Sequence, residues 1–189
     1  MGRQPTFDVK ALTPEQQRIH DEMVAGPRGT VPAPQQIWLN NPDFCDVAHK
    51  LGEYCRYRTS FPTHLSEIAI LCVGQHWRSD YEWWAHARIA REAGVPDSII
   101  EALRRGEEPD FSNYDPKGSI IVRAVREMLT TKRLSELTFR EAEATLGRTG
   151  LVDLVGIAGY YCLISLTLNV FEVKTPDASR PFFDLASMT

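Results

Sequence analysis

The longest stretch without a charged residue, 154–171, constrains the fold more than any other feature of the chain. It reads LVGIAGYYCLISLTLNVF, and 18 residues are at the lower limit for a helix that spans a membrane. Asp153 and Glu172 flank the stretch, and Lys174 is the only basic residue close enough to serve as an interfacial anchor. A helix that is apolar on every side otherwise lies at the centre of a helical bundle or in a subunit interface. We therefore predict a buried helix and no membrane partner.

Elsewhere apolar residues recur at intervals of three and four, which is typical of amphipathic helices, and no segment alternates with a period of two. Glycines and prolines fall between the helical segments. The predicted helices cover 14–25, 35–39, 44–58, 65–76, 80–93, 97–103, 119–132, 139–146 and 150–171. The pattern predicts an all-α, single-domain helical bundle over residues 1–189, with eight or nine helices, a core over 44–171 and an irregular tail over 174–189.

Four helix starts carry recognisable capping signals. Thr13 precedes a proline and an acidic residue, and Asn41 likewise stands before Pro-Asp. Thr63 is expected to cap the helix that begins near residue 65, and Ser79 or Asp80 to cap the helix that follows.

Charge and cysteine content exclude several classes of protein. With 21 basic and 25 acidic residues the net charge is −4, and without a basic run the chain is a poor candidate for binding nucleic acid. Its four cysteines, at positions 45, 55, 72 and 162, form no C-x-x-C pair and are too sparse for a disulfide scaffold. The polar N-terminal segment lacks an apolar signal region. We therefore expect a cytoplasmic protein.

The most unusual segment is 76–86, HWRSDYEWWAH, which holds three of the four tryptophans and two of the five histidines. On a helix, Ser79, Glu82, Trp83 and His86 share one face. A Glu–His pair four residues apart is often only a surface ion pair, worth a few tenths of a kcal/mol. If the face looks inward, the carboxylate instead sets the tautomer and the pKa of a buried imidazole, as general acid–base catalysis requires.

Residues 65–71 (LSEIAIL) and 81–95 (YEWWAHARIAREAGV) resemble the carboxymuconolactone decarboxylase family, which includes the alkyl hydroperoxidase D-like (AhpD-like) proteins. Residues 12–15, 25–29 and 159–169 resemble the longer members, so the resemblance covers most of the chain. It implies an all-helical domain of the AhpD-like type. It also implies a homo-oligomer, a trimer or hexamer, with active sites near the subunit contacts.

The motif of the peroxidase branch, C-x-x-C-x-x-x-H with a Glu on the preceding helix, transfers only in part. His86 matches the histidine and Glu67 the glutamate, whereas Ser79 and Glu82 stand where the two cysteines would be. A thiolate must attack the peroxide and then be recycled. Cys72 lies in an apolar helix, where burial should raise its pKa and make it unreactive. Thiol peroxidase activity is therefore disfavoured, and a redox protein of this fold is kept as the alternative.

The decarboxylase branch carries Glu and His four residues apart at this place, as Glu82 and His86 are. The resemblance thus implies a cofactor-free carboxy-lyase that acts on a lactone or a related small organic acid in the catabolism of aromatic compounds. Loss of carbon dioxide leaves an enolate, and His86 could protonate its carbon while Glu82 or Glu67 orients and charges the imidazole. In a third interpretation, the three residues form a satisfied buried network in a non-catalytic oligomeric protein.

Three further residues are candidates for binding the substrate. Arg58 would supply a cation for an anionic substrate, Trp83 would form a wall for a flat ring, and Ser79 lies on the same face as Glu82. The chain is longer than the simplest lactone decarboxylases, and the Trp83-Trp84 pair indicates a different pocket.

A metal site is not expected. Glu67, Glu82 and His86 could be joined by His64 or His76, but neither an H-E-x-x-H motif nor a histidine-rich set is present.

Overall fold

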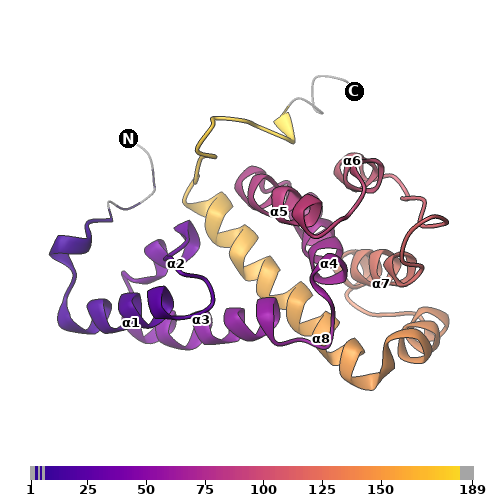
Figure 1. Cartoon of the computed structure of the whole chain (residues 1–189), viewed down its shortest axis with the longest axis horizontal. Helices are drawn as coiled ribbons and strands as arrows, with labels where there is room; N and C mark the ends of the chain where they lie inside the picture. Colours follow the sequence, from indigo (N-terminus) through magenta and orange to yellow (C-terminus); the bar gives the residue numbers. More distant parts are fainter. Residues whose placement is uncertain (1–2, 4, 6, 184–189) are drawn as a thin grey trace.

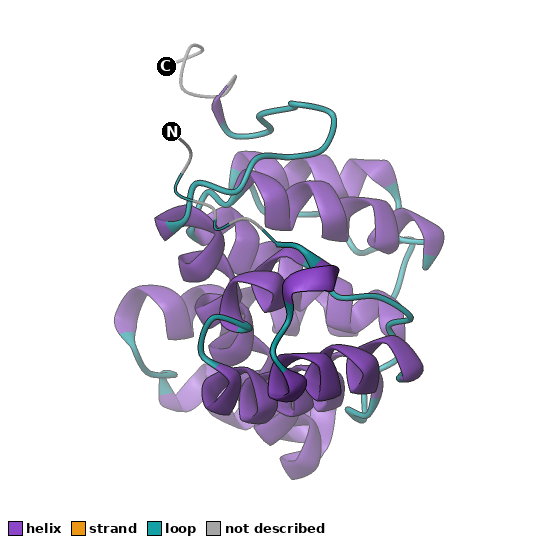
Figure 2. Ribbon diagram, turned by 90° about the vertical axis from the view of Figure 1, so that its left-hand side faces the viewer, coloured by secondary structure: helices purple, strands orange, loops and turns teal. Residues whose placement is uncertain are grey.

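The structure, a computed structural model, describes residues 3, 5 and 7–183 (Figure 1). Its elements are η1 (Val9–Ala11), α1 (Pro14–Ala25), α2 (Ala33–Trp38), α3 (Pro42–Tyr57), α4 (Thr63–His76), α5 (Asp80–Glu92), α6 (Asp97–Arg105), α7 (Lys117–Thr131) and α8 (Glu136–Val170). Figure 2 shows helices and loops, and no strand occurs in the described part of the chain. The predicted all-α class and the predicted number of helices are confirmed.

Helix α8 runs diagonally through the molecule, with α1, α2 and α3 on one side and α4 to α7 on the other (Figure 1). It packs against α2, α3, α4, α5 and α7. By length and composition it is the one described helix that could cross a membrane, with a mean hydropathy of 1.8 over its most apolar window. However, 61% of that window is buried within the fold, which supports the prediction of a central helix.

Helix α4 forms the centre of the second group. It packs against α5, α6, α7 and α8, and its residues from Leu65 to Gly74 are all buried. This burial explains why the sequence of α4 is apolar on every side and shows almost no amphipathic pattern. Any polar residue on this helix must therefore find its partner inside the protein, and Glu67 is such a residue.

The capping predictions are confirmed at Thr13 and Asn41, wrong at Thr63, and right only in position at Ser79. Thr13 accepts a hydrogen bond from the N–H of Gln16 in a full capping box, and the Asn41 side chain caps α3. Thr63 is instead the first residue of α4, because the chain becomes helical directly after Pro62. Ser79 is the N-cap of α5 by position, but its side chain makes no capping hydrogen bond.

The predicted helices 139–146 and 150–171 form one continuous element, α8, with a sharp break. The break is at Gly147, whose φ of 73° and ψ of 168° lie in a region that glycine alone adopts readily. The sequence thus locates the break correctly and places the start of the first helix three residues late.

One apolar core cluster includes Ile19 and Phe182, which lie outside the predicted core of 44–171. Residues 184–189 of the predicted tail lie outside the described residues.

Candidate active site

The helices α4 and α5 bring Glu67 and His86 together in the interior. The side-chain exposure of Glu67 is 2% and that of His86 is 7%, and His86 Nδ1 lies 2.6 Å from Glu67 Oε2. A bond this short between an imidazole and a carboxylate is typical of a charge-assisted hydrogen bond in which the ring N–H donates. The inward face predicted for α5 is therefore real, and the surface-pair interpretation is wrong.

The second ring nitrogen of His86 faces the carboxylate of Glu82, one turn earlier on α5. Nε2 lies 3.1 Å from Glu82 Oε1, but the angle is not that of a hydrogen bond. Glu82 Oε1 is buried and has no hydrogen-bond partner. Glu67 therefore orients the ring through Nδ1, while Nε2 remains the nitrogen that is free to exchange a proton.

We call Glu67, Glu82 and His86 the buried triad, and burial and charge act on the pKa values of two of them, His86 and Glu82. Burial disfavours the imidazolium of His86, but the charges of Glu67 and Glu82 and the hydrogen bond from Glu67 outweigh it, so the pKa of His86 is raised. Burial is also the main cause of the raised pKa of Glu82, which His86 partly offsets. Both His86 and Glu82 therefore hold a proton to a higher pH than they would in the unfolded chain.

Helix α8 contributes an aromatic wall that the sequence had not marked as part of the site. The ring of Tyr161 meets the ring of His86 edge-on, with centroids 5.1 Å apart and planes at 85°. Burial, followed by the charges of Glu82 and Glu67, raises the pKa of Tyr161 well above its ordinary value, so the phenol remains neutral. The Gly-Tyr-Tyr segment was visible in the sequence, but nothing in its spacing linked it to α5.

Two arginines border the triad, and neither is the one that was predicted. The charges of Arg56 and Arg28 both lower the pKa of Glu82, which places both guanidinium groups near it. Each side chain is half-buried, and neither pairs with a carboxylate in the described part of the chain. Nη2 of Arg28 is buried without a hydrogen-bond partner. Arg28 nevertheless lies beside the Tyr160 hydroxyl group, whose pKa its charge and its hydrogen-bonding group lower against the larger effect of burial.

Arg28 is held against α8 and α3 by close packing. A Cβ atom on Gly52 of α3 would lie 2.0 Å from the Tyr160 hydroxyl oxygen and 2.8 Å from Arg28 Nη2. Gln35 donates a hydrogen bond of 3.2 Å to the same hydroxyl group. Only a glycine at position 52 leaves room for these three side chains, so the backbone of α3 approaches the site closely.

The remaining predicted site residues are distributed differently. Ser79 is completely buried and its Oγ has no hydrogen-bond partner. Trp83 is buried with its ring edge-on to Phe182 in the C-terminal segment, with centroids 5.3 Å apart, so it packs in the core. Arg58 is exposed and forms an ion pair with Glu53, and the structure does not bring it to the triad.

The four cysteines are free, and none of them stands on α5. Burial raises the pKa of Cys72 to about 12, as expected for a thiol on an apolar helix, and raises that of Cys45 to about 12 and that of Cys55 to about 11. These three thiols are therefore almost entirely protonated at neutral pH, and a thiol is a poor nucleophile.

Two cavities are present at other places in the molecule. One, of about 630 Å³, lies between the start of α5, the end of α8 and residues 172–180, and it includes Arg78, Tyr81 and Arg180 in its lining. The other, of about 370 Å³, lies along α8 next to Phe139. Neither of these two cavities is lined by a residue of the buried triad.

The additional histidines considered for a metal site do not join the triad. His64 Nε2 lies 3.1 Å from Asp115 Oδ2, and the His64 ring meets Tyr114 edge-on. His76 is exposed at the end of α4.

Comparisons with known proteins establish the fold. No protein-family model matches the chain, and no curated protein matches it in sequence. One similar structure is a peroxidase-related protein from Silicibacter sp. TM1040, with a TM-score of 0.72 and 12% sequence identity. The match covers 89% of this chain and 89% of that protein's chain. An alkylhydroperoxidase AhpD core protein from Ralstonia eutropha JMP134, also described as peroxidase-related, covers 93% of both chains at a TM-score of 0.72 and 16% identity.

A third similar structure is the debrominase Bmp8, crystallised as a cysteine-to-alanine variant in complex with 2,3,4-tribromopyrrole. The match covers 92% of the debrominase chain and 93% of this chain, with a TM-score of 0.65 and 15% sequence identity. The chain therefore has the AhpD-like fold. At 12–16% identity these likenesses show the fold and not the activity.

Proposed function

We propose that the protein is a cofactor-free carboxy-lyase in which His86 carries the proton that replaces the lost carboxyl group. The observation that supports this most directly is the hydrogen bond of 2.6 Å between Glu67 and His86 Nδ1, which leaves Nε2 without an aligned partner. A general acid must hold its proton at the working pH and present it in a fixed direction. The two carboxylates help His86 to hold its proton by raising its pKa, and the hydrogen bond to Glu67 fixes the direction of the ring.

The reaction balances with the groups that the chain supplies. The bond between the carboxylate and the substrate carbon breaks, carbon dioxide leaves, and the electron pair remains as an enolate on the neighbouring carbonyl group. The imidazolium of His86 then gives its Nε2 proton to the carbon, and the neutral ring takes another proton from solvent. Glu82 holds the imidazolium before transfer, and its raised pKa allows it to relay the new proton.

Arg28 and Arg56 are proposed to bind the anionic substrate in place of Arg58. Both are half-buried, and both are close enough to Glu82 to affect its pKa. Guanidinium groups match carboxylates in shape and charge, and they also stabilise the negative charge of an enolate oxygen. Because both side chains reach partly into solvent, we propose that the substrate enters between α3 and the loop that joins α1 to α2.

The proposed substrate is a small organic acid with a flat, unsaturated skeleton, such as a lactone acid from aromatic catabolism. The edge-on ring of Tyr161 gives the site one apolar wall. The debrominase of similar fold binds a bromopyrrole, which is also a small flat ring, and this makes such a substrate reasonable for the fold.

The test is a decarboxylation screen over lactone acids and β-keto acids, followed by carbon dioxide release with purified variants. His86→Gln should lower kcat by about 10²–10⁴-fold, the usual contribution of a general acid, without unfolding the protein. His76→Gln, which removes an exposed imidazole at the end of α4, should leave kcat unchanged. Full activity in His86→Gln would contradict the proposal.

The same variants separate the two other interpretations. Peroxide reduction that is lost when all four cysteines become serine would favour a thiol redox protein of this fold. A protein that turns over none of these acids, and in which variants of the triad change only the free energy of unfolding, would be the non-catalytic alternative.

We also propose that the chain is a cytoplasmic homo-oligomer, a trimer or hexamer. Large apolar side chains are exposed on α3, at Val47 and Leu51, and on α8, at Val155 and Leu166. These two helices are neighbours in the fold, and exposed apolar surface of this kind is typical of subunit contacts. Light scattering after gel filtration should give three or six chains per particle, and Val155→Glu should reduce that number.

A further inference from the structure

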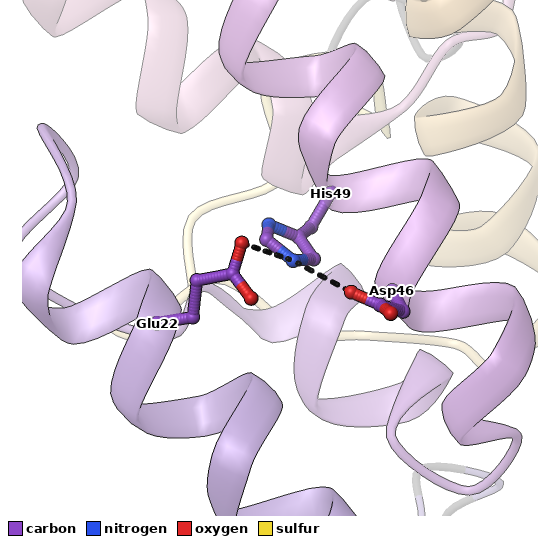
Figure 3. A group of neighbouring side chains, drawn as sticks. All are labelled: Glu22, Asp46 and His49. Atoms are coloured by element: carbon purple, nitrogen blue, oxygen red, sulfur yellow. Dashed lines mark ion pairs between the residues drawn. The ribbon is translucent and has the colours of Figure 1, made fainter.

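A second group of polar side chains lies where α1 packs on α3 (Figure 3). Glu22 of α1 and Asp46 and His49 of α3 each offer one ligand atom, and these three atoms lie within 4.8 Å of one another. His49 Nε2 is 3.7 Å from Asp46 Oδ1 and 3.9 Å from Glu22 Oε1. Neither distance is short enough for a hydrogen bond.

His49 is the member of the group that needs an explanation. Its side chain is 3% exposed, and Nε2 is buried without a hydrogen-bond partner. Burial also lowers the pKa of His49, although Glu22 and Asp46 act in the opposite direction, so the ring is neutral at physiological pH. A neutral, unpartnered imidazole nitrogen beside two carboxylates has the donor chemistry of a metal ligand.

The two carboxylates already attract a cation. Lys50 Nζ lies 2.6 Å from Asp46 Oδ1 and 3.6 Å from Glu22 Oε1, the same two oxygen atoms that face His49. Arg18 pairs with the outer oxygen atoms, Asp46 Oδ2 and Glu22 Oε2. The lysine side chain is half exposed and can leave, whereas His49 is fixed in the interior. The ammonium group therefore stands where a divalent ion would sit.

We propose that Glu22, Asp46 and His49 form a binding site for a first-row divalent metal ion, zinc above all, which competes with Lys50. In a tetrahedral zinc site the nitrogen and oxygen ligands are about 3.4 Å apart. The separations of 3.7 and 3.9 Å from His49 therefore need to close by a few tenths of an ångström, and the two carboxylate oxygen atoms, which lie within 4.8 Å of each other, need to approach as well. Glu22 is exposed enough to make this movement. One imidazole ligand favours zinc and other late first-row ions, such as cobalt or nickel, over calcium and magnesium, which prefer all-oxygen sites.

Such an ion would join α1 to α3. Glu22 stands on the last turns of α1, and α3 is the main partner of α1 in the fold. An ion bound only by the folded protein stabilises it, so zinc should raise the melting temperature and slow hydrogen exchange in α1.

The experiment is calorimetric titration of zinc into the full-length chain with Cys162→Ser, which removes the partly exposed thiol. His49→Gln should weaken zinc binding by at least about tenfold, and Lys50→Met should strengthen it, because the competing ammonium group is gone. His20→Gln is the matched control, since it removes a histidine of α1 that stands beside Asp21 and outside the group. It should leave the affinity unchanged.

Two results would overturn the proposal. One is equal zinc affinity in the parent chain and in His49→Gln, because exposed carboxylates alone would then account for the binding. The other is binding weaker than about 1 mM in both the parent chain and Lys50→Met. If His49→Gln fails to fold, Glu22→Gln decides the question, since Glu22 is exposed and the same loss of affinity is expected. Cobalt adds a readout, because its visible spectrum reports the coordination geometry.

Discussion

His86 stands between two acidic side chains that come from different parts of the sequence. Glu82 is its neighbour on α5, one turn away, while Glu67 comes from α4 and makes the hydrogen bond to the ring. The carboxylate that orients the imidazole is thus the one further away in the sequence. The two are not equivalent, because Glu67 is aligned with Nδ1 and Glu82 has an oxygen atom without a hydrogen-bond partner.

The protonation of His86 can be followed directly by NMR titration of the labelled ring. Its pKa should lie above 6.5, because the charges of Glu67 and Glu82 outweigh the effect of burial. Glu67→Gln should lower this pKa, since it removes one charge and changes the hydrogen bond. The ring of His76 in the same spectra is the internal control, and a lowered pKa of His86 in the parent chain would contradict the arrangement described here.

Arg56 and Arg58 show how a residue can be misplaced from the sequence. Both stand at the end of α3, and Arg58 was selected because it precedes the helix of Glu67. Two residues along a helix are about 200° apart around its axis, so side chains at these positions point in nearly opposite directions. Arg56 is half-buried and its charge lowers the pKa of Glu82, whereas Arg58 is exposed and pairs with Glu53.

At the scale of elements, the break in α8 decides how the apolar part of that helix meets α3 and α4. Gly147 adopts a φ of 73°, and the 23 residues after it, up to Val170, form the part that crosses the molecule (Figure 1). Asp153 on this part accepts hydrogen bonds from the Tyr54 hydroxyl, at 2.6 Å, and from the backbone N–H of Ser60, at 2.7 Å. These bonds fix α8 against α3 and thereby place Tyr161 beside His86.

Replacement of the glycine at the break should destabilise the protein. Gly147→Ala should cost about 1–3 kcal/mol of unfolding free energy, because a side chain is strained at this φ and ψ even though the space around it is open. Gly156→Ala, on the same helix at an ordinary helical position, should be neutral or stabilising by up to about 1 kcal/mol. Urea denaturation of both variants measures the difference, and equal stabilities would argue against the break.

At the scale of the whole molecule, the protein encloses an ionisable group of three residues near its centre. The raised pKa values of His86 and Glu82 mean that the folded state binds more protons there than the unfolded chain does. The stabilisation that these groups contribute is complete at a pH below the pKa values they have in the unfolded chain. It is lost as the pH rises through the higher pKa values they have in the folded protein. Burial lowers the pKa values of His49 and His76. The stabilisation that these two residues contribute is therefore lost as the pH falls, not as it rises.

The stability of the whole protein should therefore decrease as the pH rises above about 6.5, the ordinary pKa of histidine. The cysteine and tyrosine groups with raised pKa values begin to contribute only at higher pH. In His86→Gln the loss of stability with rising pH should be smaller, because the variant has no imidazole whose proton uptake differs between the folded and unfolded states. Guanidinium denaturation at several pH values tests this, and an equal slope in the variant and the parent chain would count against a raised pKa of His86.

Most of the fold and part of the site could be predicted from local patterns. Spacing on one helix correctly put Ser79, Glu82, Trp83 and His86 on the inward face of α5, since that relation depends only on helical geometry. Tyr161 could not be found in this way, because its contact with His86 joins residues 75 positions apart through the packing of α8. The group around His49 was missed for the same reason, as Glu22 belongs to another helix.

The sequence by itself determined that the chain is all-helical, that its uncharged helix is central, and that α5 turns Glu82 and His86 inward. These properties follow from the period of apolar residues and from the placement of glycine and proline, which act over a few residues. Only the tertiary structure decided that Glu67 binds Nδ1, that Arg28 and Arg56 border the triad, and that Arg58 does not. Those relations depend on the angles at which helices pack and on which side chains fill the space between them, so they are a property of the folded chain as a whole.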